Sequence, residues 1–466
     1  MNRVIPWVLV SLLGTAPLLA QQDSVAAKRP NVLFLFADDQ RPDTIGALGN
    51  PVIKTPNLDA LANRGMVFAN AYCMGATLGA VCNPSRHQML SGMSLYHYKE
   101  RRPTHKGTFG DVFTKAGYAT YQRTKSGNSA KKYHKGFTHR GYLNDGKVRR
   151  SGHHGKDAAD HAIAFLSDTW DKSRPLFMYI GFAGPHDPRV AAPEWKKLYK
   201  RQDIPLPANY LPFHPLDNDE LVVRDERLAK WPRTKDEVRR HLHDYYACIS
   251  SMDHHIGRVI QKLKDLGQYD NTIIIFSADH GLAVGSHGLF GKQNLYEHSM
   301  GAPLIFAGPG IRKGRTDAFA YLFDIFPTTA DLCGLSFPDD LDGKSLARVI
   351  HGEQDRVRSS VFLAYKDGQR AVRKGRWKLY RFPKIDRHLL FDLDADPDEI
   401  HDLAKGPQRA ERVAKMFALM QEQQKVFDDP EPLTVANPGR AELDEAFFKN
   451  LPQRKKRARR NRKKKK

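Results

Sequence analysis

Short runs of apolar, β-branched and aromatic residues alternate with segments of helical periodicity along the first two thirds of the chain. The short runs predict strands, several of them buried on both faces, at residues 31–36, 118–122, 175–181, 272–277 and 303–306. The segments between them predict helices at residues 58–64, 108–115, 157–168, 238–263 and 321–332. This alternation predicts an α/β fold with a large, mostly parallel mixed sheet flanked by helices.

The pattern changes after about residue 355. Four short strand-like runs follow at close spacing, with a helical segment at residues 411–426 behind them. They predict a smaller C-terminal subdomain with an antiparallel sheet. We therefore expect a main domain over residues 28–355 and an α+β subdomain over residues 356–450. Two stretches with little periodicity, residues 125–155 and 192–230, predict irregular structure.

Both ends of the chain differ from its body. Residues 1–20 combine Arg3 with a mostly apolar run interrupted by two prolines and a glycine, which predicts a secretory signal peptide. A membrane anchor is the alternative, which the short and interrupted run disfavours. We therefore expect a secreted or periplasmic protein. Residues 451–466 are a basic tail with eleven Lys or Arg and no acid, and we expect it to be disordered.

The tail carries half of the formal net charge of +22, and the rest of the chain is still basic. Such a balance favours anionic partners. Three roles stay open for the tail: binding an anionic surface, binding an anionic polymer, or a solvated extension without a partner. We expect no nucleic-acid partner. Four cysteines in 466 residues do not form a disulfide scaffold, although one or two bridges remain open.

Polar side chains directly follow four of the predicted strands. They are Asp38-Asp39, Lys125, His186 and Asp279-His280. Ligands bind beyond the carboxyl ends of the strands in open α/β sheets, and in a parallel sheet those ends share one edge. We therefore expect these side chains to form one site.

Three of these side chains, Asp38, Asp39 and Asp279, are carboxylates. Crowded like charges are unfavourable unless a cation lies among them. Oxygen ligands suit calcium or magnesium, whereas the nitrogen of His280 suits a transition metal, so the residues leave the metal open. The alternative for Asp38-Asp39 is a helix cap or a turn.

The segment Cys82–Arg86 places a candidate nucleophile and a cation at a predicted helix start, with Pro84 at the first helical position. A helix N-terminus offers amide donors to an anion and favours ionisation of a thiol. A disulfide with Cys73, nine residues upstream, is the alternative. A metal, a nucleophile and cations such as Arg86 and Lys292 describe a site for a phosphate or sulfate ester.

These motifs resemble one family. Cys82-x-Pro84-Ser85-Arg86 with Leu90-Ser91-Gly92 resembles the signature of the type I sulfatases, in which the cysteine is oxidised to formylglycine. Further matches extend in order from about residue 30 to 405: Ala37-Asp38-Asp39, Thr55–Asp59, Pro185–Pro188, Ser277–Gly281, His287-Gly288 with Lys292, Arg373–Lys378 and Phe391–Pro397. The pairs Pro185-His186 and Asp279-His280 are similar to the iduronate-sulfatase-like branch. The resemblance implies an alkaline phosphatase-like fold.

The resemblance also implies roles. The hydroxyl of a formylglycine hydrate made from Cys82 would attack sulfur. Arg86 and Lys125 would orient the hydrate, Lys292 and His186 would bind the sulfate, and His186 would protonate the departing alcohol. A calcium ion would be held by Asp38, Asp39, Cys82, Asp279 and His280. We thus expect hydrolysis of sulfate esters on a sulfated carbohydrate or polysaccharide, and a formylglycine-generating maturation enzyme as a partner.

One position departs from the family pattern. The family has a His two or three residues after the lysine equivalent to Lys125, where this chain has Gly127 and Asn128. Our hypothesis is that His134 takes over its role of accepting the proton during sulfate expulsion. Two other functions remain as alternatives: a phosphonate or phosphate ester hydrolase of the same superfamily, and a non-catalytic binder of sulfated glycans.

Overall fold

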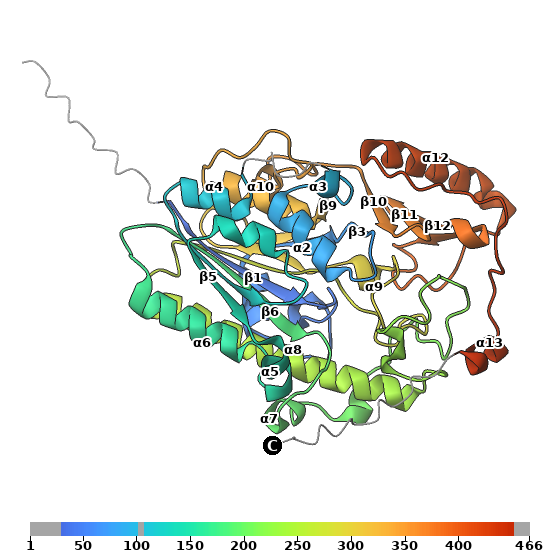
Figure 1. The fold of residues 1–466 in the computed structure, drawn as a ribbon, viewed down its shortest axis with the longest axis horizontal. Coiled ribbons are helices and arrows are strands. Elements are labelled where there is room, and N and C mark those ends of the chain that lie inside the picture. The colour runs from blue at the N-terminus through green and yellow to red at the C-terminus, as the bar shows by residue number, and fades with distance from the viewer. Residues whose placement is uncertain (1–28, 101–106, 452–466) are drawn as a thin grey trace, which may run out of the picture.

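The computed structural model describes residues 29–100 and 107–451 (Figure 1). The predicted signal peptide at residues 1–20 lies outside the described residues, as does the basic tail apart from Leu451. Within the described part of the chain, no helix is both long and apolar enough to cross a membrane.

The predicted apolar runs form the centre of an eight-stranded sheet. Its strands, in spatial order, are β5 (His139–Leu143), β4 (Ala119–Lys125), β6 (Leu176–Pro185), β1 (Asn31–Asp38), β7 (Thr272–Ala278), β8 (Leu304–Ala307), β2 (Met66–Tyr72) and β9 (Gly314–Tyr321). The five strands from β5 to β7 are mutually parallel. β8 runs antiparallel to β7 and β2, and β9 pairs parallel with β2. The expected mostly parallel mixed sheet is confirmed.

Both faces of the central strand β1 are buried because each contacts a separate apolar core. Phe34 and Phe36 belong to one core, and Leu33 and Leu35 belong to the other. This is why the sequence of β1 shows a continuous apolar run rather than alternation. Figure 1 shows one helix layer with α2 (Cys82–Ser91), α4 (Phe109–Lys115) and α10 (Ile325–Leu332), and a second layer with α6 (Lys156–Ala164) and α8 (Lys235–Asp265).

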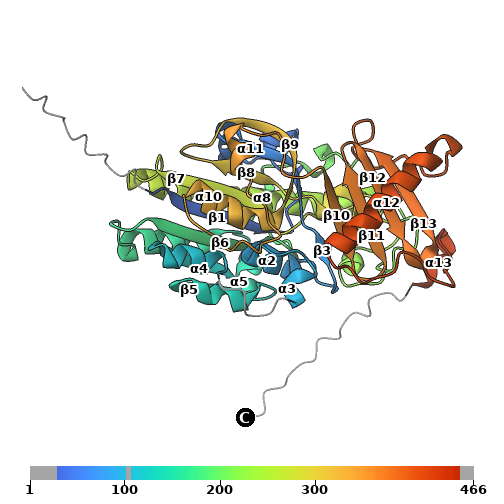
Figure 2. The same ribbon diagram turned by 90° about the horizontal axis from the view of Figure 1, so that it is seen from above.

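The smaller sheet lies at one end of the molecule, beside the main sheet (Figure 2). It contains β13 (Arg387–Asp392), β12 (Trp377–Phe382), β11 (Gln369–Lys374), β10 (Ser360–Tyr365) and β3 (Gly75–Ala76). The four C-terminal strands are antiparallel, as predicted, and α12 (Ala410–Val426) packs on them. β3 pairs parallel with β10, so the segment just before Cys82 also belongs to this sheet.

The remaining helices are short or lie near the sheet edges. They are α1 (Pro56–Arg64), α3 (His97–Glu100), α5 (Asp145–Ser151), α7 (Pro193–Lys196), α9 (Glu297–Met300), α11 (Ala347–His351) and α13 (Glu445–Asn450). The short 3-10 helices are η1 (Gly46–Leu48), η2 (Lys131–Gly136), η4 (Arg201–Asp203), η5 (Glu226–Leu228), η6 (Leu322–Asp324), η7 (Pro383–Ile385) and η8 (Pro407–Arg409). The segment η3 (Phe165–Thr169) is a π-helix.

Two local predictions are wrong. Residues 125–155 are not an irregular loop, because they contain the edge strand β5 and the helix α5. The side chains of β5 are mostly exposed, so the strand carries no apolar pattern. Pro84 is the third residue of α2 rather than the first, since the helix begins at Cys82. Proline is still tolerated there, because the amides of the first helical turn have no partner within the helix.

Candidate active site

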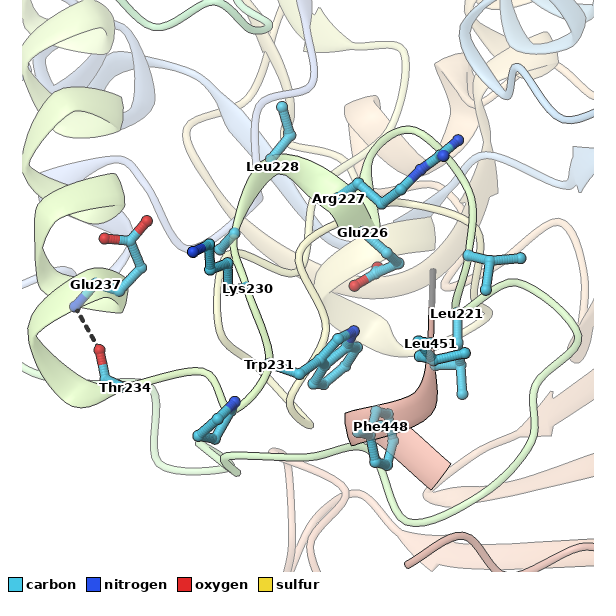
Figure 3. Close-up of a pocket in the computed structure, with 13 residues that line it drawn as sticks. Leu221, Glu226, Arg227, Leu228, Lys230, Trp231, Thr234, Glu237, Phe448 and Leu451 are labelled. Atoms are coloured by element: carbon cyan, nitrogen blue, oxygen red, sulfur yellow. Dashed lines mark hydrogen bonds between the residues drawn. The ribbon is translucent and has the colours of Figure 1, made fainter. Parts of the chain in front are cut away.

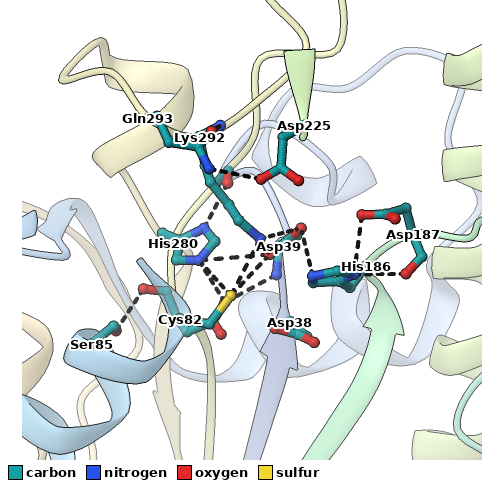
Figure 4. A network of polar contacts seen from close by, with 12 residues as sticks. Asp38, Asp39, Cys82, Ser85, His186, Asp187, Asp225, His280, Lys292 and Gln293 are labelled. Atoms are coloured by element: carbon teal, nitrogen blue, oxygen red, sulfur yellow. Dashed lines mark hydrogen bonds and ion pairs between the residues drawn. The ribbon is translucent and has the colours of Figure 1, made fainter. Parts of the chain in front are cut away.

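The four predicted strand ends meet at one edge of the main sheet. Asp38 ends β1 and Lys125 ends β4, while His186 and Asp279 directly follow β6 and β7. These four strands are adjacent and parallel, so their carboxyl ends share one side of the sheet. Figure 4 shows Asp39, His186 and His280 grouped around Cys82, the first residue of α2.

Cys82 lies at the centre of this group. Its Sγ atom is 3.2 Å from Nζ of Lys292, 3.2 Å from Nε2 of His280 and 3.6 Å from Oδ1 of Asp39. The thiol is free, as are the other three cysteines, so the alternative of a disulfide with Cys73 is wrong. Burial raises the pKa of the Cys82 thiol well above its ordinary value, against the opposing charges of Lys125 and Lys292.

A group of four side chains fits a metal ion. Ligand atoms of Asp39, Cys82, Asp279 and His280 all lie within 4.8 Å of one another, and all four residues are buried. Nδ1 of His280 is 2.8 Å from the carbonyl oxygen of Gly281, a contact that places the proton on Nδ1 and leaves the Nε2 lone pair facing the group. Two carboxylates and one imidazole nitrogen are suitable donors for a divalent cation.

Asp38 lies beside this group but faces cations instead. Its Oδ1 atom is 2.6 Å from Nζ of Lys125, and its Oδ2 atom is 3.2 Å from Nη2 of Arg149. A third cation, Arg86, lies 3.6 Å from Oδ1. Burial alone would raise the pKa of Asp38, but these cations, Lys125 first, hold it well below its usual range. The role of Asp38 as a metal ligand stays a prediction.

Arg86 joins the signature helix to the strand ends. Its guanidinium lies 3.1 Å from Oδ2 of Asp279 and donates to the hydroxyl of Tyr179. The hydroxyl of Ser85 donates to the main-chain oxygen of Asp279 over 2.7 Å. Both side chains are buried, so α2 is fixed to the end of β7 and Cys82 is held against the metal-ligand group.

His186 borders the site from the end of β6. Its Nδ1 atom donates to the carbonyl oxygen of Asp187 over 2.7 Å, and its Nε2 atom lies 3.9 Å from Oδ2 of Asp39. Burial lowers the pKa of His186 below its ordinary value. The ring is therefore oriented by its Nδ1 contact, with Nε2 directed into the site.

Lys292 forms the opposite wall. Its ammonium lies 2.7 and 2.9 Å from the two carboxylate oxygens of Asp39. Burial alone would lower the pKa of Lys292, but Asp39 and its neighbours raise it well above the ordinary value. The loop that carries Lys292 is fixed on both sides: the amide of Gly291 donates to Glu226 over 2.7 Å, and the side chain of Gln293 donates to Asp225 over 2.8 Å.

The sequence did not identify three of these side chains. Arg149 lies on α5, a helix without an apolar pattern, and reaches Asp38 only through the tertiary fold. Asp225 and Glu226 belong to the segment predicted as an irregular excursion, and nothing local marks them as partners of the Lys292 loop. All three lie in the two stretches predicted to be irregular, where their residue types alone gave no specific signal.

His134 occupies a neighbouring buried position on η2. Its Nδ1 atom lies 3.2 Å from the hydroxyl of Tyr142, and its Nε2 atom has no hydrogen-bond partner among the described residues. Its ring packs at 6.4 Å from the ring of Tyr179, which contacts Arg86. Burial, reinforced by the charge of Arg86, lowers the pKa of His134 to about 4. The hypothesis about His134 stays a prediction.

The fold and the site together define a hydrolase of the alkaline phosphatase-like superfamily. A large mixed sheet carries acidic, histidine and lysine side chains at one edge, around the first residue of a helix. Residues 30–335 match the family model described as Sulfatase, and residues 285–426 match that described as N-sulphoglucosamine sulphohydrolase, C-terminal. The chain belongs to the sulfatase family and is a sulfatase enzyme.

Known proteins similar to this chain agree with that assignment. The N-acetylglucosamine-6-O-sulfatase of Bacteroides thetaiotaomicron is 27% identical over 497 residues, which cover 87% of this chain and 88% of the relative. Human iduronate 2-sulfatase is 28% identical, with 66% and 70% covered. A solved structure described as a complex with its substrate D-glucosamine-2-N,6-O-disulfate has a TM-score of 0.72 and 25% identity, covering 87% of this chain and 99% of that chain.

Proposed function

We propose that this protein hydrolyses sulfate esters on a sulfated carbohydrate of the glycosaminoglycan type, using a formylglycine made from Cys82 and a bound calcium ion. The observation that carries the proposal is the convergence of metal-ligand side chains and Lys292 on Cys82, with Lys125 bound to the neighbouring Asp38. Named relatives that act on glucosamine and iduronate sulfates support the sugar class.

The cations of the site would bind the sulfate group. The ammonium of Lys292 already contacts an anion, the carboxylate of Asp39, and it also contacts Sγ of Cys82. His186 directs Nε2 toward the same place. Fixed donors of this kind stabilise negative charge that develops on sulfuryl oxygens without reorganising during the reaction.

Asp39, Asp279 and His280 would hold the metal, with Asp38 and the residue at position 82 as further ligands. A bound calcium ion would supply positive charge that orients the nucleophile and polarises the ester. The nucleophile would be a hydroxyl of the hydrated formylglycine. Arg86 lies within the same network, and Lys125 joins it through Asp38, so both would keep that hydroxyl aligned with the sulfate.

His186 would give a proton to the departing alcohol from Nε2. Burial lowers its pKa, which opposes this role in the free enzyme. A sulfate ester bound beside the ring would favour the imidazolium form, because a nearby negative charge raises a histidine pKa. Substrate binding would thus help to protonate the residue that later acts as the acid.

His134 would accept the proton that drives expulsion of the sulfate, in place of the histidine absent at Asn128. Its low pKa keeps the ring neutral near pH 7, and its Nε2 atom has no hydrogen-bond partner among the described residues. Wild-type-like turnover in His134→Ala would exclude this role. The matched control is His154→Ala, another buried histidine whose pKa is about 4 and which bonds to a carbonyl oxygen.

Two measurements test the main proposal. Intact-mass analysis of the active protein should show a deficit of about 18 Da at Cys82, the signature of its conversion to formylglycine by a maturation enzyme. Sulfate release from glucosamine-2-N,6-O-disulfate should disappear in Cys82→Ala. Active protein with an unmodified cysteine would contradict the mechanism.

Three further measurements test the remaining predictions of function and location. Faster release of phosphate than of sulfate from matched esters would identify a phosphoesterase instead. Salt-sensitive binding without any turnover would identify a glycan binder. N-terminal sequencing of protein recovered from a secreting host would test removal of residues 1–20 and, with it, the proposed secreted or periplasmic location.

A further inference from the structure

The two side chains to which the proposed function assigns sulfate binding, His186 and Lys292, reach the site from different elements (Figure 4). Nε2 of His186 lies 3.9 Å from Oδ2 of Asp39, and Nζ of Lys292 lies 2.9 Å from the same oxygen. His186 follows β6, whereas Lys292 belongs to the loop after β7. The spacing of these two side chains therefore depends on tertiary contacts that join the end of β6 to that loop.

Arg224 makes such a contact on the side of His186. Its Nη1 and Nη2 atoms donate to the two carboxylate oxygens of Asp187, at 3.0 and 2.5 Å. Oδ1 of the same carboxylate lies 3.2 Å from Nδ1 of His186. A bidentate arginine–carboxylate pair fixes the orientation of the carboxylate as well as its distance. Arg224 thus orients the carboxylate that contacts the Nδ1 side of the His186 ring.

The same guanidinium is connected to the loop that carries Lys292. Its Nε atom donates to Oδ1 of Asp225 over 2.8 Å, and Oδ2 of Asp225 accepts from the side chain of Gln293 over 2.8 Å. The side-chain oxygen of Gln293 accepts in turn from the amide of Lys292 over 3.0 Å. Arg224 therefore bridges the two sides of the site through one carboxylate on each side.

The segment that carries Arg224 is itself anchored. Glu226, two residues further on, is buried and accepts a hydrogen bond from the amide of Gly291 over 2.7 Å. Figure 3 shows Trp231 of the same segment beside Phe448 of α13, and their ring centres lie 4.5 Å apart. The side chain of Arg224, in contrast, is 59% exposed. Its replacement therefore removes the bridge without opening a cavity in the core.

The charge of Arg224 is already compensated. All three of its guanidinium nitrogens donate to carboxylates, two to Asp187 and one to Asp225. Two carboxylates thus share one guanidinium, and the group of three carries a net negative charge. Such a group does not attract a sulfate ester, because like charges repel. The geometry therefore favours a role for Arg224 in fixing its neighbours over direct contact with the substrate.

We propose that Arg224 is a positioning residue that holds His186 and Lys292 at the separation needed to bind the sulfate group. It acts through Asp187 on one side and Asp225 on the other. The planar fork of donors is essential to this role, and a lysine does not reproduce it, because an ammonium is a compact point charge on a flexible stem. This inference rests on the roles that the proposed function gives to His186 and Lys292.

The test compares Arg224→Ala and Arg224→Lys with Arg376→Ala and Arg376→Lys. Arg376 is a matched control because it is also exposed, at 44%, and also lies between two carboxylates, Asp392 and Asp394, but it directly precedes β12 of the small sheet. The values of kcat and KM are measured with glucosamine-2-N,6-O-disulfate and normalised to folded, formylglycine-containing enzyme. Calorimetry measures the Kd of inorganic sulfate for the same proteins.

We expect both Arg224 variants to lower kcat by about tenfold to a hundredfold, because misplaced donors stabilise the transition state less. The Kd of inorganic sulfate should rise about threefold in both, since the ground state uses the same donors. The Arg376 variants should keep the wild-type values. A rise in KM at unchanged kcat would show that Arg224 binds the substrate directly, and wild-type activity in Arg224→Lys would show that only its charge matters. Either result, or unchanged values in Arg224→Ala, would overturn the positioning role.

A double-mutant cycle with Asp187→Asn tests the path of the effect. If Arg224 acts through Asp187, then Arg224→Ala should lower kcat less in the Asp187→Asn background than in the wild type. Fully additive losses would overturn that path. If the wild type released no sulfate, the proposed function would fail, while the Kd values of inorganic sulfate would still decide the positioning role.

Discussion

Replacing Lys292 with methionine removes the ammonium that lies 3.2 Å from Sγ of Cys82, the residue proposed to become the nucleophile. The ammonium lies 2.7 and 2.9 Å from the oxygens of Asp39, which shows how closely it can approach a sulfuryl oxygen. At about 3 Å and an effective dielectric constant of about 20, two unit charges interact by roughly 5.5 kcal/mol. If about half a unit of charge develops in the transition state, the loss is about 3 kcal/mol, or about a hundredfold in rate.

The assay is sulfate release by Lys292→Met from a sulfated monosaccharide, normalised to folded, formylglycine-containing enzyme. Conversion of Cys82 is measured by intact mass, because Lys292 contacts the unmodified thiol as well. Normalising in this way separates an effect on maturation from an effect on the reaction.

The matched control is Lys378→Met. Lys378 is also fully buried and also pairs with carboxylates, Glu297 at 2.7 Å and Glu399 at 3.0 Å, but it lies on β12 of the small sheet. It should lower the free energy of unfolding and leave kcat per folded molecule within about threefold of wild type. Activity of Lys292→Met within about threefold of wild type would refute the role of its charge in the reaction.

Four further outcomes follow from the structure. His97 pairs with Asp342 at 2.8 Å, and this contact raises the His97 pKa. The stabilising contribution of the pair is therefore complete below about pH 6.5 and is lost as the pH rises through the folded-state pKa. In urea unfolding, His97→Gln should lower the free energy of unfolding more at about pH 6 than at about pH 9. Asp429→Ala leaves Arg370 buried without its carboxylate partner and should lower the free energy of unfolding by about 3–5 kcal/mol. Replacing both residues by apolar ones should lower it less in the same urea assay. A chelator should lower both activity and melting temperature, and added calcium should restore them, whereas unchanged values would exclude a bound metal. Deleting residues 454–466 should weaken heparin binding most at low salt, and an unchanged salt dependence would exclude a substrate role for the tail.

The sequence predicted the centre of the main sheet because burial on both faces leaves a visible pattern. β1 and β7 are continuous apolar runs, and every residue of both strands is buried. The edge strands β5 and β9 were missed for the opposite reason: β5 is mostly exposed, and the first half of β9 contains Gly, Arg, Thr and Asp. Their existence depends on backbone pairing with β4 and β2, which leaves no hydrophobic period in the chain.

The candidate site was predictable where a strand end carried it. Lys125 and His186 needed only the assumption of a parallel sheet to be placed together. Arg149 and Arg224 could not be found in this way, because each reaches the site from a separate polar segment by the path of the chain in space. Residues of this kind depend on the tertiary fold and have no local signal.

The charge balance of the site explains why it would attract a sulfate ester. Three buried carboxylates, Asp38, Asp39 and Asp279, face the buried Arg86, Lys125 and Lys292 and the half-buried Arg149. The carboxylates are therefore already compensated by the protein's own side chains. A divalent ion added to this set leaves a surplus of positive charge in a buried site, where electrostatic interactions are stronger than in water. A sulfate monoester carries one negative charge, so its binding would reduce that surplus.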